Sequence, residues 1–191
     1  MVTFYIVRHG NTELNYREVL QGQIDSPLTK EGYEDANFLS KKFKKTKFDA
    51  IFSSDLGRAF TTAYIIADNI GYKKEIFRCK DFREIDFGDL TFKKKSEVID
   101  LYNQLKADSN FKFKNGESHN EVKKRVLKKF NDIKGYKNVL VVSHNNPIRA
   151  ILSEGLNKDF NSVLTRKTSH RFIAKFEVKN NKIINFIILN E

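Results

Sequence analysis

Short apolar runs alternate along the chain with longer stretches in which apolar side chains recur at helical spacing. The runs Phe4-Tyr5-Ile6-Val7 and Val139-Leu140-Val141-Val142 are typical of buried strands. The whole pattern predicts strands at 3–7, 49–53, 76–79, 138–143, 172–178 and 183–189, and helices at about 29–44, 57–70, 118–133 and 146–156. This alternation predicts an α/β fold, a three-layer α/β/α sandwich with a mostly parallel central sheet and an antiparallel C-terminal edge.

Two local signals support these element ends. Ser118 and Glu121 have the spacing of a capping box, in which each side chain satisfies a free backbone amide, so the helix is expected to start there. The segment Lys179-Asn180-Asn181-Lys182 separates the last two strands, and asparagine tolerates the positive φ that a tight hairpin requires. The two closing strands are therefore predicted to pair in antiparallel.

Length and composition favour one globular unit. The 191 residues contain no linker rich in Pro, Gly or Ser, so we expect a single domain over residues 1–191 with a lid-like insertion at about 88–116. No apolar stretch approaches the roughly 20 residues needed to span a bilayer, and the first residues lack a basic leader segment. The lone Cys79 cannot form an internal disulfide and is interpreted as a small strand residue. These features predict a cytoplasmic protein without a membrane partner.

The net charge of +11 raises the question of a nucleic-acid partner. The lysines are spread in short groups, such as Lys93-Lys94-Lys95 and Lys128-Lys129, and no nucleic-acid-binding motif surrounds them. Solvated helix faces explain these groups better, so no nucleic-acid partner is expected. A positive field would still draw an anionic substrate towards a positive cleft.

Two histidines each follow a predicted strand directly. Arg8-His9-Gly10 comes after the first apolar run, and His144 comes after Ser143 at the end of a later strand. Ligands bind outside the carboxyl ends of strands in an open α/β sheet, so both imidazoles are expected to face one pocket. The other functional side chains that follow strands include more cations than carboxylates, which suits a phosphate monoester: Arg8, Asn15, Arg58 and Glu84.

Six sequence blocks together resemble the histidine phosphatase superfamily, in its phosphoglycerate-mutase-like branch with an Arg-His-Gly motif. The blocks are Arg8-His9-Gly10-Asn11-Thr12-Glu13-Leu14-Asn15, Gln21-Gly22, Ser53-Ser54-Asp55-Leu56-Gly57-Arg58-Ala59, Arg83-Glu84-Ile85-Asp86-Phe87-Gly88, Gly116-Glu117-Ser118 and Val142-Ser143-His144. The resemblance runs from residue 3 to about residue 178 and implies a phosphoglycerate-mutase-like fold.

The resemblance also implies roles for individual residues. His9 would be the nucleophile that becomes phosphohistidine, and Glu84 the general acid and then the general base. Arg8, Arg58 and His144 would hold the phosphoryl oxygens, so neither a metal nor a cofactor is expected. Only a mutase would need a 2,3-bisphosphoglycerate primer.

Further residues are interpreted with an alternative beside each. Asn15, and Gln21 with Gly22, are expected to contact substrate, although Asn15 can equally stabilise its own turn. Asn145 stands where the family commonly has glycine and is included as a binding residue, which leaves substrate choice open.

For three other residues a purely structural role is an alternative to a functional one. Arg58 is assigned to phosphate and to the free amides of its helix start, against a salt bridge with Asp55. His119 and His170 lack ligand-like companions and are expected at the surface.

The sequence favours a phosphatase that acts on a small phosphorylated metabolite, because the lid-like stretch is shorter than in the family's glycolytic mutases. A phosphoglycerate-mutase-type phosphotransferase is the main alternative, and a non-catalytic or nucleic-acid-binding module is a further one. A cysteine phosphatase is excluded, because the residue six positions after Cys79 is Ile85 and not arginine. A homodimer is left open.

Overall fold

The computed structural model describes residues 1–191 and contains one six-stranded sheet. The strand order is β3-β2-β4-β1-β5-β6, in which the first four strands are parallel and the last two are antiparallel to their neighbours. The strands are β1 (Val2–Arg8), β2 (Ala50–Ser54), β3 (Ile76–Cys79), β4 (Asn138–Ser143), β5 (Ile173–Lys179) and β6 (Lys182–Asn190). The predicted mostly parallel sheet with an antiparallel C-terminal edge is confirmed.

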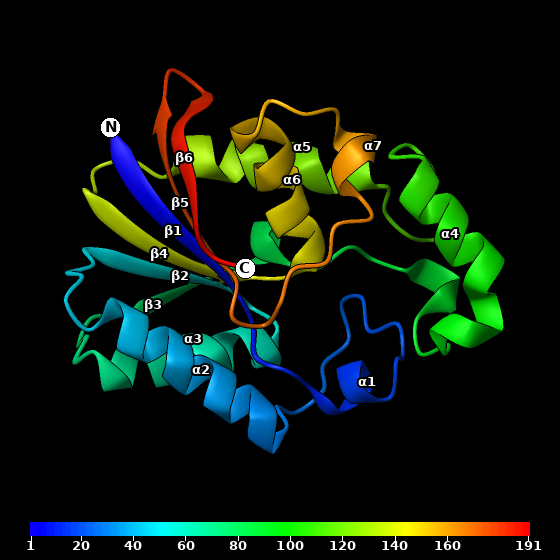
Figure 1. Ribbon diagram of the computed structural model, residues 1–191, viewed down its shortest axis with the longest axis horizontal. Helices are drawn as coiled ribbons and strands as arrows, with labels where there is room; N and C mark the ends of the chain where they lie inside the picture. The colour runs from blue at the N-terminus through cyan, green and yellow to red at the C-terminus, as the bar shows by residue number, and fades with distance from the viewer.

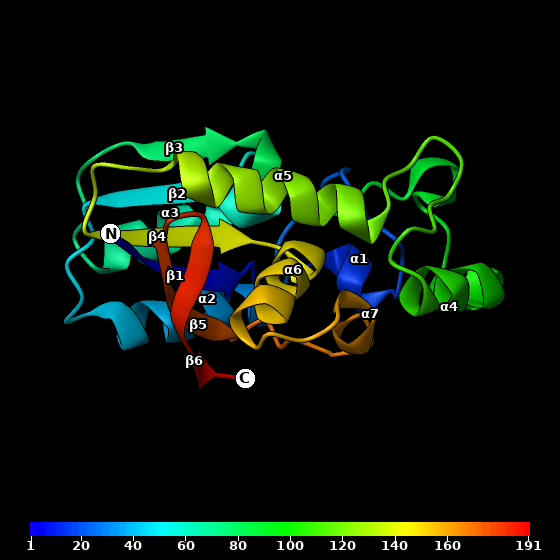
Figure 2. The ribbon, with the colours of Figure 1, turned by 90° about the horizontal axis from the view of Figure 1, so that it is seen from above.

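Helices cover both faces of this sheet (Figures 1 and 2). One face carries α2 (Lys30–Phe43) and α3 (Gly57–Asn69), and the other carries α5 (His119–Asp132) and α6 (Asn145–Gly155). Three short helices lie beyond the carboxyl ends of the parallel strands: α1 (Glu13–Tyr16), α4 (Ile99–Ala107) and α7 (Phe160–Val163). The four long helices and the sheet form the predicted three layers.

Strand β4 shows why a continuous apolar run is needed at the centre. Val139 and Val141 belong to the core cluster shared with α5 and α6, while Leu140 and Val142 belong to the cluster shared with α2 and α3. All four side chains are fully buried. A central strand between two helical layers therefore has no polar face.

The two local signals at element ends are both confirmed. Ser118 Oγ accepts a hydrogen bond from the Glu121 amide, and the Glu121 carboxylate accepts one from the Ser118 amide. In the hairpin between β5 and β6, Asn180 and Asn181 have φ of 50° and 61°. Two consecutive residues with positive φ match the right-handed twist of the paired strands.

The lid-like stretch 88–116 extends away from the sheet. It contains the 3₁₀ turns Gly88–Leu90 and Lys95–Val98 and helix α4, which stands apart from the three layers in both ribbon views. Its two ends are held close together, because the Asp89 amide donates to the Lys114 carbonyl at 3.1 Å. A Cβ on Gly88 would lie 2.1 Å from that same carbonyl oxygen, so only glycine fits at the base of the lid.

No helix of the chain has the length and apolar character that crossing a bilayer requires.

Candidate active site

The two predicted histidines lie side by side because their strands are neighbours. Strands β1 and β4 are parallel neighbours in which Arg8 pairs with Ser143. The residues that follow the two strands, His9 and His144, therefore lie beside each other. The His9 amide donates to the Ser143 carbonyl at 3.0 Å, which continues the ladder by one residue. The ring centroids of His9 and His144 are 4.9 Å apart, and both side chains are buried.

His9 is held as one neutral tautomer. Its Nδ1 lies 2.8 Å from the Gly10 carbonyl oxygen, which can only accept, so Nδ1 carries the hydrogen and Nε2 carries the lone pair. Burial, followed by the charges of His144 and Arg58, lowers the pKa of His9 well below its ordinary 6.5. His9 therefore presents an uncharged Nε2 at neutral pH, as a nucleophile must.

His144 has no hydrogen-bond partner at either ring nitrogen, although its exposed fraction is 0 %. Burial, and next the charge of Arg58, lowers the pKa of this imidazole well below 6.5. A buried polar group without a partner is costly, so both ring nitrogens of His144 retain unused hydrogen-bonding capacity.

A small cavity of about 70 Å³ lies at this end of the sheet. Among the residues that line it are eight of the nine predicted site residues: Arg8, His9, Asn15, Gln21, Gly22, Arg58, Glu84 and Asn145. The ninth, His144, packs against His9 but is not on the lining. The lining also includes Lys95 and Tyr102 from the lid and Asn146 from α6, none of which was assigned to the site from the sequence.

Arg58 is fixed by backbone carbonyl oxygens. Its two Nη atoms donate to the carbonyls of Ile24 and Gly22, at 2.6 and 2.7 Å, and Nη1 lies 3.4 Å from the Asp25 carboxylate. The alternative pairing with Asp55 is wrong, because Asp55 forms its ion pair with Arg83. Nε of Arg58 is buried and has no partner.

The helix start at Arg58 does not offer free amides, which corrects the sequence interpretation. The backbone N–H groups of Gly57 and Arg58 both donate to the Asp25 carboxylate. Asp25 caps α3 from a loop 33 positions before Arg58, a contact that local sequence spacing does not reveal. The hydrogen-bonding capacity left in this region therefore belongs to the guanidinium of Arg58.

Arg8 has a similar arrangement on the other side of the cavity. Its Nη1 donates to the Thr168 carbonyl at 2.5 Å, and its buried Nε has no partner. Burial lowers the pKa of Arg8 to about 10, against the opposing effect of Glu84. The side chain is still a cation at neutral pH.

Glu84 is the carboxylate that lines the cavity. Its Oε1 accepts hydrogen bonds from the backbone amides of Ile85 and Asn146, at 2.9 and 3.1 Å. The second of these amides belongs to the first turn of α6, where free N–H groups stabilise a carboxylate. The neighbouring carboxylates do not line the cavity: Asp81, Asp86 and Asp89.

The loop that carries Glu84 is held by an arginine that sequence reasoning did not assign a role. Arg125 of α5 donates to the backbone carbonyls of Asp81, Arg83 and Glu84 at 2.8 to 3.0 Å. It also forms a two-pronged ion pair with Glu117. The only sequence indication was the Gly116-Glu117-Ser118 block, which contains the partner and not the arginine itself.

The sequence model of the histidine phosphatase superfamily (branch 1) matches residues 4–184, nearly the whole chain. The chain belongs to this superfamily. It is accordingly a histidine phosphatase, that is, a phosphoric monoester hydrolase.

Known proteins similar to this histidine phosphatase are named after two activities. A Hydrogenobacter thermophilus protein, provisionally named a phosphoserine phosphatase, is 33% identical in an alignment of 159 residues that covers 80% of this chain and 77% of that protein. A Bartonella tribocorum protein named a 2,3-bisphosphoglycerate-dependent phosphoglycerate mutase is 30% identical in an alignment of 170 residues that covers 81% of this chain and 82% of that protein.

The solved structure of Bacillus stearothermophilus YhfR superposes on this histidine phosphatase with a TM-score of 0.86. The two chains are 26% identical, and the match covers 96% of this chain and 95% of the other.

The expectation that His119 and His170 lie at the surface is wrong for His119, which is buried, while His170 is partly exposed. His119 is 1 % exposed, its Nε2 lies 3.0 Å from Asn146 Oδ1, and burial lowers its pKa to about 4. His170 places Nδ1 2.6 Å from the His9 carbonyl oxygen, and burial lowers its pKa to about 3. Each imidazole is held by a contact between distant segments, which sequence inspection for nearby metal-ligand companions could not find.

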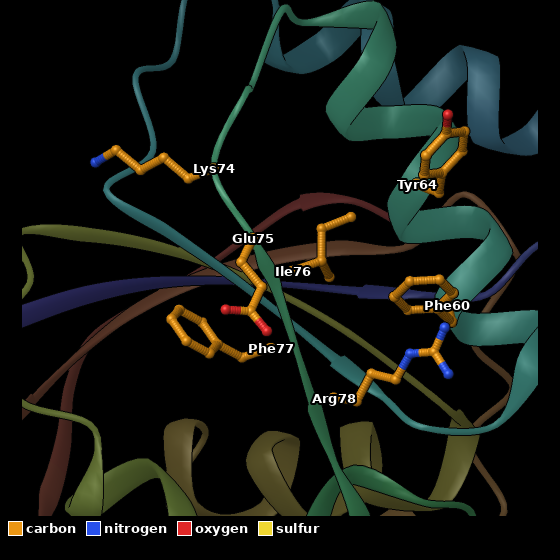
Figure 3. A pocket seen from close by; sticks show the side chains of 7 residues that line it. All are labelled: Phe60, Tyr64, Lys74, Glu75, Ile76, Phe77 and Arg78. Atoms are coloured by element: carbon orange, nitrogen blue, oxygen red, sulfur yellow. The ribbon is translucent and has the colours of Figure 1, made fainter.

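A separate hollow of about 570 Å³ lies at the β3 edge of the sheet. Figure 3 shows Phe60 and Tyr64 of α3 on one side of it and the side chains of β3 on the other, with the Arg78 guanidinium beside the Phe60 ring. That guanidinium carbon is 3.7 Å from the ring centroid. The hollow contains none of the predicted phosphate-binding residues.

Proposed function

We propose that this histidine phosphatase hydrolyses small phosphate monoesters through a phosphohistidine on His9. The observation that carries the proposal is the neutral His9 ring, whose Nδ1 is engaged by the Gly10 carbonyl and whose Nε2 is left beside a cavity lined by two arginines. A cavity of about 70 Å³ suits one phosphoryl group.

In the first half-reaction, the Nε2 lone pair of His9 attacks phosphorus and forms a P–N bond. The ester P–O bond breaks, and Glu84, in its protonated form, donates its proton to the leaving oxygen. Two easier displacements replace one difficult one, because the histidine carries the phosphoryl group between them.

In the second half-reaction, water attacks phosphorus from the side that the alcohol has left. The Glu84 carboxylate accepts the proton of that water, the P–N bond breaks, and inorganic phosphate is released with His9 neutral again. One carboxylate therefore serves as acid and then as base.

The phosphoryl oxygens are assigned to Arg8, Arg58 and His144. The buried Nε atoms of both arginines and both ring nitrogens of His144 are without partners, so each side chain has hydrogen-bonding capacity to offer. Charge on the transferring group is stabilised by donors that need no rearrangement.

Substrate contacts are assigned to Asn15, Gln21, Gly22 and Asn145. Gln21 Oε1 is buried without a partner, while its Nε2 donates to Thr12 Oγ1. Asn15 also contributes to its own turn, since its Oδ1 accepts from that same hydroxyl. The turn interpretation of Asn15 is therefore confirmed, and its contact with substrate is part of the proposal.

Mutase transfer is the second candidate, because similar proteins include one named a phosphoglycerate mutase. A mutase would return the phosphoryl group of His9 to an alcohol, with 2,3-bisphosphoglycerate as primer. Hydrolysis is favoured by the compact lid. Released inorganic phosphate, measured beside isomer formation from a phosphoglycerate in the presence of the primer, distinguishes the two.

The direct test is His9→Ala assayed with an aryl phosphate. The variant should release no phosphate above background, because no other neutral nucleophile is assigned to the cavity, while its circular dichroism spectrum matches the wild type. Turnover by His9→Ala at the wild-type rate would reject the proposal.

A further inference from the structure

A second, larger pocket adjoins the catalytic cavity. This outer pocket has a volume of about 970 Å³ and shares four lining residues with the cavity: Arg8, Lys95, Tyr102 and Asn145. Its other walls come from the lid, from α6 and from the loop 165–170. A group attached to a phosphate in the cavity would therefore extend into the outer pocket.

The outer pocket has a cationic wall. Lys106, Arg149 and Lys167 line it without forming an ion pair. The two carboxylates that also line it are Glu18 and Glu191, and Glu191 is already paired with Arg166. The pocket thus has an excess of unpaired positive charge.

The cations lie close enough to repel one another. Burial lowers the pKa of Lys106, and the charges of Arg149, Lys95 and Lys167 lower it further. Like charges collected in one pocket destabilise each other until an anion enters. The three elements that supply them are far apart in sequence.

Buried, hydrogen-bonded side chains hold the cationic wall in place. Arg149 is 4 % exposed, its Nε donates to the Arg166 carbonyl at 2.9 Å and its Nη1 donates to Asn146 Oδ1 at 3.0 Å. Thr168, also buried, has its Oγ1 2.7 Å from the Asn145 amide group. The basic loop 166–171 is therefore fixed as a pocket wall by contacts to α6.

We propose that the outer pocket binds a second phosphate group carried by the leaving-group part of the substrate. The preferred substrates are then phosphate monoesters that bear a remote second phosphate. This rests on the proposed function, because the reacting phosphate must occupy the catalytic cavity. A dianion fits the excess of unpaired cations better than a single carboxylate does, and arginine and lysine both suit phosphate oxygens.

The second phosphate is bound but not cleaved. Its contacts with Lys106 and Lys167 exist both before and during the reaction, so they lower KM and leave kcat unchanged. No proton or electron is exchanged in the outer pocket.

The test uses phosphonates, which bind as phosphates do but cannot be hydrolysed. Titration calorimetry on the wild-type protein compares pentylphosphonate with pentane-1,5-bisphosphonate, which differ only in the second anionic group. Binding of the bisphosphonate should be tighter by about tenfold or more, as expected for hydrogen bonds to a charged group.

The double variant Lys106→Gln with Lys167→Gln should lose most of that gain and keep its affinity for pentylphosphonate. The control Lys124→Gln with Lys128→Gln removes the same charge from exposed positions of α5 outside both pockets and should keep the gain. Equal loss in both double variants would mean a general field effect and would overturn the proposal.

Other outcomes are also decisive. If pentylphosphonate binds and the second phosphonate adds nothing, the outer subsite is rejected while the catalytic cavity stands. If neither compound binds, the proposed function fails with it. A 5-phosphonopentanoate that binds as tightly as the bisphosphonate would overturn the assignment to a second phosphate.

Discussion

The catalytic cavity and the outer pocket are adjacent but are built in opposite ways. The cavity takes its central residues from the ends of parallel strands and holds them with backbone contacts, such as Gly10 with His9 and Gly22 with Arg58. The outer pocket takes its cations from the lid, the flank of α6 and a late loop. In this account the catalytic cavity determines the reaction, and the outer pocket determines which substrates are preferred.

This difference predicts which substitutions affect all substrates and which affect some. A change in the cavity should slow every monoester that depends on the altered group. A substitution of an outer-pocket lysine should raise KM only for substrates whose leaving group extends into that pocket.

Glu84→Gln should slow hydrolysis of alkyl phosphates by roughly 10² to 10⁴-fold, because their leaving oxygens need a proton. Aryl phosphates with acidic leaving groups should be slowed much less in the first half-reaction. A plot of rate against leaving-group pKa measures this. Uniform slowing across the series would contradict the role as general acid.

Arg125→Lys should have a smaller effect of the same kind, on the order of 10² at most, since small misplacement of a catalytic group is that costly. Lysine keeps the charge, but its single ammonium nitrogen cannot reproduce the contacts that the Nε and two Nη atoms of Arg125 make with three carbonyls and Glu117. The leaving-group plot should steepen as it does in Glu84→Gln.

A matched control is Arg78→Lys at the β3 edge, where the guanidinium stacks on Phe60 away from the cavity. Its leaving-group plot should coincide with that of the wild type. If Arg125→Lys loses stability and shows no change in this plot, its role is structural and not one of positioning Glu84.

The smallest effect on turnover is expected at His119. Burial in the folded protein lowers the pKa of His119 from 6.5 to about 4. As the pH falls below 6.5, the unfolded chain binds a proton at His119 and the folded state does not, which favours unfolding. This contribution to stability is present above pH 6.5 and is lost between pH 6.5 and 4, by about 3 kcal/mol.

His119→Gln keeps an amide donor for Asn146 but cannot titrate. Denaturant unfolding at several pH values should show a flatter stability curve between pH 6.5 and 4 for the variant, with turnover at neutral pH close to that of the wild type. Parallel curves for the two proteins would show that His119 takes no part in the acid sensitivity.

The six strands and the four long helices could be predicted from the sequence because each carries its own local signal, whereas the short helices α1, α4 and α7 were not predicted. The apolar run of β4, the Ser118 capping box and the two asparagines of the last hairpin act within a few residues. Placing His9 beside His144 needed only the rule that parallel strand ends share one edge.

Contacts between distant segments could not be predicted in this way. Asp25 caps α3, Arg125 holds the Glu84 loop, and His170 reaches the His9 carbonyl across 161 positions. Nothing in the local sequence of any of these residues differs from that of an ordinary surface residue. The outer pocket could not be assembled from the sequence for the same reason, because its cations come together only in the folded chain.

The nitrogen that becomes phosphorylated tests the central claim most directly. The Gly10 carbonyl engages Nδ1 of His9, so the phosphoryl group must attach to Nε2. Protein quenched in alkali during turnover, digested and examined by ³¹P NMR and mass spectrometry should contain phosphate on Nε2 of His9. Phosphate on Nδ1 or on another residue, or turnover without any phosphorylated histidine, would contradict the account.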